Sequence, residues 1–517
     1  MANPPSTEST TDTGMKKTLG LTGVTVNAMA LIAPGAFLWI TFQLQAAQMV
    51  GDMGTGMAMW PGVVFALIIA FLTAISYAEL AHKYPEAGAG SAYYFAEKSM
   101  MDRVETQFHR FARITKFITG WAAHLFYWVY PGVMVGMLAT LVAYILGQFG
   151  LELSVPYQMG IAVLAAVFIG SVAVRGITGS TMASWVINII QLTVLVIFSL
   201  GAIWFRVTNP ANVEFVYPTA PSVVIPFNLA AMLFQSTIAI LILVGFESAT
   251  ALGAEAKNPK RDVPRAVILS LVIQGILAYL LEYFAANYAL NTGLTATTAD
   301  GTLVTGMDAA AVSTAPIGDL IQQIGNAMLG GSGGFALMIV VAITVAIAVI
   351  GSVLACMNTA VRVSYAMAAD KEMPELLGML HGKYATPHMA VWILVAVSAV
   401  IGAFGVISIV NLTAVTLASN IGTFILYALI CVATVLAFAG KENSSRVKHL
   451  IIPVVGLIAN IGMLVAIVAL GVLSGGDSQK EAFIAIGIAV VWAIISGIYY
   501  VINSRRRGPQ PTVVSAK

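Results

Sequence analysis

The sequence predicts an all-α, polytopic membrane protein with twelve transmembrane helices. Of its 517 residues, 59% are hydrophobic and only 9% are charged, whereas roughly a quarter of the residues in a soluble domain carry a charge. Twelve runs reach the length of about 20 apolar residues that a helix needs to cross a bilayer. The two cysteines, Cys356 and Cys431, lie in apolar runs and form no spacing typical of a metal site or a disulfide.

The apolar runs place the spans in order along the chain. We expect them at 19–47, 58–82, 117–147, 157–175, 182–206, 227–255, 265–290, 333–366, 387–406, 410–438, 450–474 and 481–503. Residues 1–18 form a polar tail and residues 504–517 a basic one. The spans divide into a first group of five (19–206), a second group of five (227–438) and two further helices (450–503).

Basic loop residues predict the orientation. If the N-terminus lies inside, 23 of the 25 Lys and Arg residues fall on the inner side, and only Arg206 and Lys480 do not. Cytoplasmic loops carry such an excess. We therefore expect a multi-pass protein of the plasma or inner membrane with both termini in the cytoplasm. The net charge of +2 lies in short loops, which argues against a nucleic-acid partner.

Two spans carry helix-breaking residues near mid-membrane. Span 1 contains "IAPGAFLW", in which Pro34 removes a backbone donor and Gly35 permits unusual dihedral angles. Span 6 contains "LVGFESATALG", with Gly245 two residues before Glu247. Interrupted spans in corresponding positions indicate two inverted five-helix repeats with a binding site between the breaks. A simple proline kink in span 1 is the alternative.

Glu247 is the most unusual residue of span 6. A carboxylate in the membrane costs at least about 2.5 kcal/mol, so some interaction must offset that cost. Two interpretations stay open. Glu247 could take up and release a proton during a transport cycle, or it could be a structural group bonded permanently to backbone across the break.

Four stretches carry a resemblance to a known family. They are "IAPGAFLW", "YPEAGAGSAYYF", "GFESATALGAEAKNPKRDVPRAV" and "RVSYAMAADKEMPELLGMLHGKYATPHMAV". The chain resembles the amino acid–polyamine–organocation (APC) superfamily of transporters over residues 15–505. The resemblance implies the leucine-transporter-type fold, with helices 1 and 6 broken. It also implies secondary active transport of amino acids by alternating access.

The resemblance further implies three groups of substrate-binding residues. Span 1 would bind the substrate carboxylate through Ala28, Met29, Ala33, Pro34 and Gly35. Span 6 would bind the ammonium through Leu241, Val244 and Gly245, with Phe246 as a wall. Span 3 would contribute Ala123, His124 and Trp128.

Coupling to a proton gradient is the expectation for energy input. Glu247, with His124 assisting, would carry the proton; the alternative for His124 is a neutral ring bonded to a helix carbonyl or a serine. Some family members have a lysine in span 5 where this chain has Gln191. Ser352 lies near the region of a family sodium site, but Val353 and Leu354 offer no side-chain oxygen, so sodium is the weaker expectation.

Other functions remain alternatives. An amino acid exchanger or a polyamine transporter would share the fold, and a ligand sensor without flux is a further possibility. The sequence shows no nucleophile, metal cluster or phosphate loop, so we expect neither an enzyme nor a cofactor.

Glu282 in span 7 is interpreted as a structural or vestibule residue. The 95–116 loop could lie along the membrane as an amphipathic helix, and the outer loop 291–330 could carry short helices. The sequence leaves open whether the protein is a monomer or a homodimer.

Overall fold

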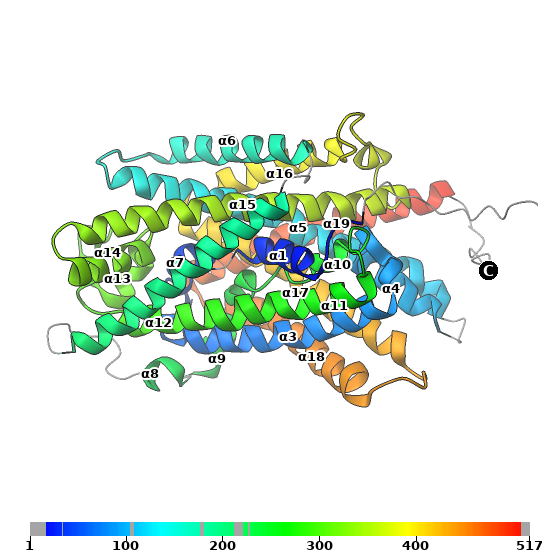
Figure 1. Ribbon diagram of the computed structural model, residues 1–517, viewed down its shortest axis with the longest axis horizontal. Helices are drawn as coiled ribbons and strands as arrows, with labels where there is room; N and C mark the ends of the chain where they lie inside the picture. Colours follow the sequence, from blue (N-terminus) through cyan, green and yellow to red (C-terminus); the bar gives the residue numbers. More distant parts are fainter. Residues whose placement is uncertain are drawn as a thin grey trace, which may run out of the picture.

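The computed structural model describes residues 17–33, 35–103, 108–175, 180–210, 221–225 and 228–507. Long helices run side by side along the longest axis of the molecule (Figure 1). In the described residues, eleven helices are long and apolar enough to cross a membrane, and one shorter apolar helix covers Leu229–Ile242. The protein is therefore an all-α, polytopic membrane protein.

The first half of the chain begins with a crossing in two pieces, α1 (Leu21–Ile32) and α2 (Ala36–Ala46). Four long helices follow: α3 (Met59–Lys83), α5 (His109–Gly147), α6 (Val155–Val174) and α7 (Ser180–Thr208).

The second half also begins with a divided crossing. It consists of α9 (Leu229–Ala239), η4 (Ile240–Ile242) and α10 (Ser248–Ala251). The next crossing contains α11 (Pro259–Leu271), the π-helix η5 (Val272–Leu280) and α12 (Leu281–Ala289). The last five are α15 (Gly333–Ala369), α16 (His388–Gly405), α17 (Ile409–Phe438), α18 (Ile452–Leu473) and α19 (Gly476–Arg507).

Short elements connect the crossings. The hairpins pair β1 (Met49–Val50) with β2 (Met53–Gly54) and β3 (Thr295–Thr297) with β4 (Leu303–Thr305). The short helices are η1 (Gly56–Ala58), η2 (Pro85–Gly90), α4 (Ala92–Met101), α8 (Pro221–Val224), α13 (Gly306–Val312), α14 (Pro316–Leu329), η6 (Glu375–Gly378) and the π-helix η7 (Val447–Ile451).

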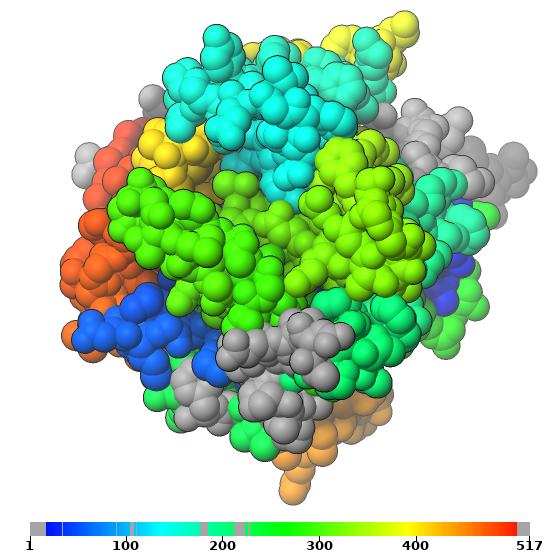
Figure 2. Space-filling model, turned by 90° about the vertical axis from the view of Figure 1, so that its left-hand side faces the viewer, coloured from blue at the N-terminus to red at the C-terminus, as the bar shows by residue number. Residues whose placement is uncertain are grey.

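The two ends of the bundle differ in charge. We call the end with Lys83, Lys257 and Arg362 the basic end, and the end with Asp300 and Asp319 the acidic end. The green to yellow-green segment around residues 290–330 covers the middle of the acidic end (Figure 2). It contains the β3–β4 hairpin, α13 and α14, so the loop at 291–330 does carry short helices.

The third crossing starts earlier than the sequence indicated. Helix α5 begins at His109 rather than at residue 117, because its polar first turns pack against α4 instead of entering apolar surroundings. Lys116 forms ion pairs with Glu97, at 2.7 Å, and with Asp370 of the α15 end, at 2.5 Å. The first part of the 95–116 loop is therefore a helix packed against α5 and α17, and residues 104–107 lie outside the described residues.

The count of twelve crossings stays a prediction for a physical reason. The sixth crossing is interrupted, so its apolar helical part spans only Leu229–Ile242. That is shorter than the stretch of about 20 residues that a continuous helix needs to span a bilayer.

Candidate functional site

The first crossing is broken in the middle. Helix α1 ends at Ile32, and Ala33 follows with a φ of 48°, stabilised by a hydrogen bond from its N–H to the carbonyl of Met29. Gly35 has a φ of 71° and precedes α2. A positive φ is uncommon for a residue with a side chain, so the chain leaves helical geometry for a few residues here. Pro34 lies outside the described residues.

Side chains from two other helices satisfy carbonyls that this break exposes. Ser352 of α15 donates to the carbonyl of Leu31 at 2.7 Å. Tyr279 of η5 lies 2.8 Å from the carbonyl oxygen of Ile32 and 2.6 Å from that of Ala33. A helix end leaves its last four carbonyls without intrahelical donors, and a membrane interior offers no water to replace them. These neighbours therefore keep the break in place.

The sixth crossing is broken directly beside the first. Between η4 and α10 the chain turns through Leu243–Glu247, and Gly245 has a φ of 133°. A methyl group on Gly245 would lie 2.8 Å from Cγ1 of Ile32 and 3.0 Å from its backbone nitrogen. Only glycine permits this approach. The structure thus places Gly245 against Ile32, which directly precedes Ala33. Gly245 and Ala33 are both predicted substrate-binding residues.

Glu247 lies at the start of α10, with only 1% of its surface exposed. Its carboxylate accepts hydrogen bonds from the Tyr427 hydroxyl of α17 at 3.0 Å and the Tyr127 hydroxyl of α5 at 3.2 Å. It also accepts the backbone N–H of Gly245 at 3.0 Å. Three donors compensate much of the cost of burying a carboxylate. Glu247 therefore links three helices across the break, and its role in proton coupling stays a prediction.

Aromatic side chains form a wall beside this carboxylate. Phe246 contacts the ring of Tyr427 at a centroid distance of 5.5 Å and that of Tyr77 at 6.1 Å. Tyr77 also lines a small cavity, together with Ala123 and Tyr127 of α5 and residues of α15 and α17. The cavity has a volume of about 10 Å³, which is room for about one water molecule.

His124 and Trp128 lie on a different face of α5 from Ala123 and Tyr127. The Nδ1 atom of His124 lies 2.7 Å from the carbonyl of Gly120, and its Nε2 lies 2.9 Å from the Ser364 hydroxyl of α15. The Trp128 ring packs near Trp492 of α19. These contacts match the second interpretation of His124, a ring bonded to a helix carbonyl or a serine, rather than the proton-carrying one. They separate His124 from the donors that Glu247 uses.

The remaining predicted residues are buried around the breaks. Ala28, Met29, Leu241 and Val244 each expose 5% of their surface or less. The carbonyl of Met29 accepts a hydrogen bond from Gln274 of η5. Gln191 of α7 donates to the carbonyl of Thr344 on α15.

Sequence reasoning missed the tyrosines that surround the site. Tyr127 and Tyr130 follow Ala123 by four and seven residues and so share its helix face. Tyr130 donates to the carbonyl of Leu31. This spacing could have identified both residues. No comparable local signal marks Tyr279 or Tyr427, because their partners lie far away in the sequence.

Contacts close the site toward the basic end. Arg362 of α15 pairs with Glu255, which follows α10. The backbone of Leu19 pairs with that of Ala256, and Ser91 hydrogen bonds Thr250 of α10. These contacts join both broken crossings to α15 and to the segment after α3.

A buried polar network closes the site toward the acidic end. Gln235 of α9 hydrogen bonds Gln45 of α2 and Thr55, and the Tyr283 hydroxyl of α12 bonds Gln45 and Thr41. The breaks are thus enclosed from both ends in this conformation.

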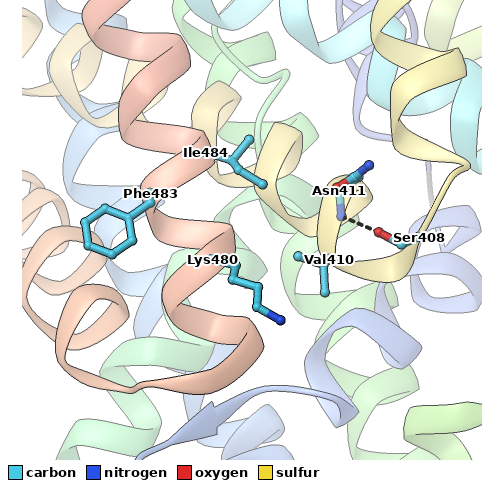
Figure 3. Close-up of a pocket in the computed structure, with 6 residues that line it drawn as sticks. All are labelled: Ser408, Val410, Asn411, Lys480, Phe483 and Ile484. Atoms are coloured by element: carbon cyan, nitrogen blue, oxygen red, sulfur yellow. Dashed lines mark hydrogen bonds between the residues drawn. The ribbon is translucent and has the colours of Figure 1, made fainter.

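A separate surface pocket is lined by residues of α17 and α19, drawn in Figure 3. It opens between the first turn of α17 and the first turns of α19, and its lining consists of Ser408, Val410, Asn411, Lys480, Phe483 and Ile484. Its position at the protein surface, and the absence of any break residue from this lining, exclude it as the predicted binding site.

Comparisons with known proteins agree with this architecture. Residues 17–495 match the family model of amino acid permeases. The chain is 25% identical to the low-affinity putrescine importer PlaP of Escherichia coli K12, over 98% of each chain. It is 24% identical to the branched-chain amino acid permease BcaP of Bacillus subtilis strain 168, over 88% of each chain. A methylthioribose transporter of Bacillus subtilis is 21% identical, over 79% of this chain and 80% of the relative.

Proposed function

This chain belongs to the amino acid permease family, and on that premise we propose that it moves amino acids across the plasma membrane by alternating access. The protein is a membrane transporter. The observation that carries the choice of site is the direct contact between the two breaks, at Gly245 and Ile32. Unwound backbone there provides the N–H and carbonyl groups that bind the two charged ends of a zwitterion.

The proposed cycle opens the two ends in turn. Opening toward the basic end requires separation of Glu255 from Arg362, and opening toward the acidic end requires disruption of the network around Gln45 and Gln235. We place the basic end in the cytoplasm, because the excess of basic loop residues predicts that orientation. An inward proton gradient is the proposed energy source.

A polyamine substrate is the second candidate. The buried carboxylate of Glu247 at the break favours it, because an ammonium group is a natural partner of a buried carboxylate. The relative PlaP is named as a putrescine importer, and the relative BcaP as a branched-chain amino acid permease.

Uptake by purified protein in proteoliposomes tests the proposal. Labelled amino acids and labelled 1,4-diaminobutane are offered in turn, with an imposed pH gradient, an imposed sodium gradient or neither. The proposal predicts uptake of an amino acid that rises with an inward proton gradient and falls when a protonophore is added. Uptake of the diamine alone would establish the second candidate. Binding without flux would indicate a sensor and would contradict transport.

A further inference from the structure

Glu282 is a second carboxyl group beside the breaks. It lies in the first turn of α12, directly after the π-helix η5, and none of its surface is exposed. π-Helical insertions within α-helices are frequently found at functional sites. The same segment supplies Tyr279, whose hydroxyl lies within hydrogen-bond distance of the carbonyls of Ile32 and Ala33. Glu282 therefore lies where the seventh crossing meets the break in the first.

The carboxyl group of Glu282 differs from that of Glu247 in its partners. Among the residues that the structure describes, neither Oε1 nor Oε2 of Glu282 has a hydrogen-bond partner. Glu247 has three donors. A buried carboxylate without donors or a counterion is strongly disfavoured, and such a group becomes neutral instead. The geometry thus suits a charged Glu247 and an uncharged Glu282.

Gly35 packs directly against this carboxyl group. A methyl group on Gly35 would lie 2.6 Å from both carboxyl oxygens of Glu282 and 2.2 Å from Cδ1 of Leu195 on α7. Such close packing leaves no space for an ammonium group or a hydrated ion between α2 and Glu282. A proton is the cation that fits this conformation.

The elements packed against Glu282 bring few other titratable groups near it. Tyr279 and Tyr283 lie one turn before and one residue after it, and their hydroxyls bond the α1 carbonyls and the side chains of Thr41 and Gln45. Helix α2 contributes none. Arg206 of α7 lies over the ring of Tyr288, and Asp319 of α14 bonds Tyr144 and Ser313. In α3, Tyr77 packs against Phe246 and Tyr427 on the Glu247 side of the breaks, and Glu79, His82 and Lys83 lie in the last turns.

We propose that Glu282 is a proton-binding site of this transporter. Its carboxyl group is protonated in the conformation in which the start of α2 packs over it. The inference rests on the proposed proton-coupled transport. When α2 moves away on one side, water reaches the carboxylate, which takes a proton from a hydronium ion and leaves a water molecule. When the site next opens to the other side, the O–H bond breaks and the proton returns to water there. Each cycle then carries one proton with the substrate.

Infrared spectroscopy of the purified protein tests the protonation directly. Wild type should show the carbonyl stretch of a buried protonated carboxyl group, which shifts in heavy water. Glu282→Gln should lose this band, Glu282→Asp should retain a shifted one, and Glu247→Gln should leave it unchanged. If the band persists in Glu282→Gln, the proposal is overturned. This test needs no substrate, so it stands even if the proposed transport of amino acids fails.

Transport in proteoliposomes tests the coupling, with the amino acid that wild type takes up most rapidly as the probe. Glu282→Gln imitates the protonated side chain, so it should retain exchange of labelled for unlabelled amino acid. It should lose accumulation driven by a pH gradient at least tenfold. Retained pH-driven accumulation would overturn the proposal. So would a variant that loses only 1,4-diaminobutane uptake, because Glu282 would then bind an ammonium group instead.

Discussion

The Glu247 carboxylate accepts a hydrogen bond from the Tyr427 hydroxyl at 3.0 Å. This bond joins the broken sixth crossing to α17. The same carboxylate reaches Tyr127 on α5 and the N–H of Gly245, so one side chain fixes the position of the break relative to two long helices. Rearrangement of the break therefore requires some of these bonds to exchange partners.

Tyr427→Phe should lower both the thermal stability of the protein and its affinity for substrate. A hydrogen bond to a charged group contributes about 1.5–3 kcal/mol, so we expect a lower melting temperature in detergent and weaker amino acid binding. Tyr157→Phe, on an exposed tyrosine of α6, is the matched control and should change neither. A double-mutant cycle with Glu247→Gln measures the coupling energy, and a value near zero would argue against this bond.

Glu247→Gln separates the two interpretations of this residue. The sequence-based expectation is that the variant loses pH-dependent uptake while it still folds. The three donors instead predict that it lowers thermal stability and transport at every pH, because an amide accepts these bonds less well than a carboxylate. Uptake rates measured across a pH series distinguish the two results. An unchanged profile with normal rates would contradict both.

The Arg362–Glu255 pair should control opening toward the basic end. Its side chains are only 12% and 20% exposed, so removal of one partner leaves a largely buried charge without its counterion. We expect Arg362→Glu to reduce transport strongly, and the exchanged pair Arg362→Glu with Glu255→Arg to recover part of it. Uptake rates measure the loss and the recovery. The rate at which a thiol reagent modifies a cysteine introduced near Thr250 reports opening toward the basic end. If the exchanged pair recovers nothing, the contact is not a simple electrostatic closure.

Ser352→Ala should destabilise the break in the first crossing. Ser352 donates to the carbonyl of Leu31 from another helix, and its loss leaves that buried carbonyl with the longer bond from Tyr130, at 3.4 Å. The carbonyl keeps one donor, so the loss should cost about 0.5–1.5 kcal/mol, the net contribution of an ordinary hydrogen bond. Ser171→Ala removes a hydrogen bond between two residues of the same helix, α6, and should change the melting temperature little. Equal melting temperatures for the two variants would contradict this role.

Both breaks could be predicted from sequence, because glycine and proline act locally on the backbone. Gly35 and Gly245 do have positive φ angles, and the start of α10 carries Glu247 as expected. The partners of these groups could not be predicted. Tyr279, Ser352 and Tyr427 lie far from the breaks in the sequence, and a helical wheel alone does not say which face of α5 meets them. His124 illustrates this limit, because it lies one residue from Ala123 but faces Ser364.

Glu282 illustrates a second limit of the sequence. Its place in span 7 indicated a structural or vestibule residue, but only packing places both carboxyl oxygens against Gly35. The pattern of Glu247 and Glu282 along the chain is similar, since each is a lone acid in an apolar run. Their difference lies in donors that come from other helices.

The contact between the two breaks is the proposed substrate site. Equilibrium binding of the transported amino acid to Gly245→Ala measures it most directly, because an added methyl group would push Gly245 away from Ile32. Gly160→Ala is the control, since a methyl group there meets nothing within 4 Å. We expect at least tenfold weaker binding in Gly245→Ala and unchanged binding in Gly160→Ala. Wild-type affinity in a folded Gly245→Ala protein would contradict this proposal.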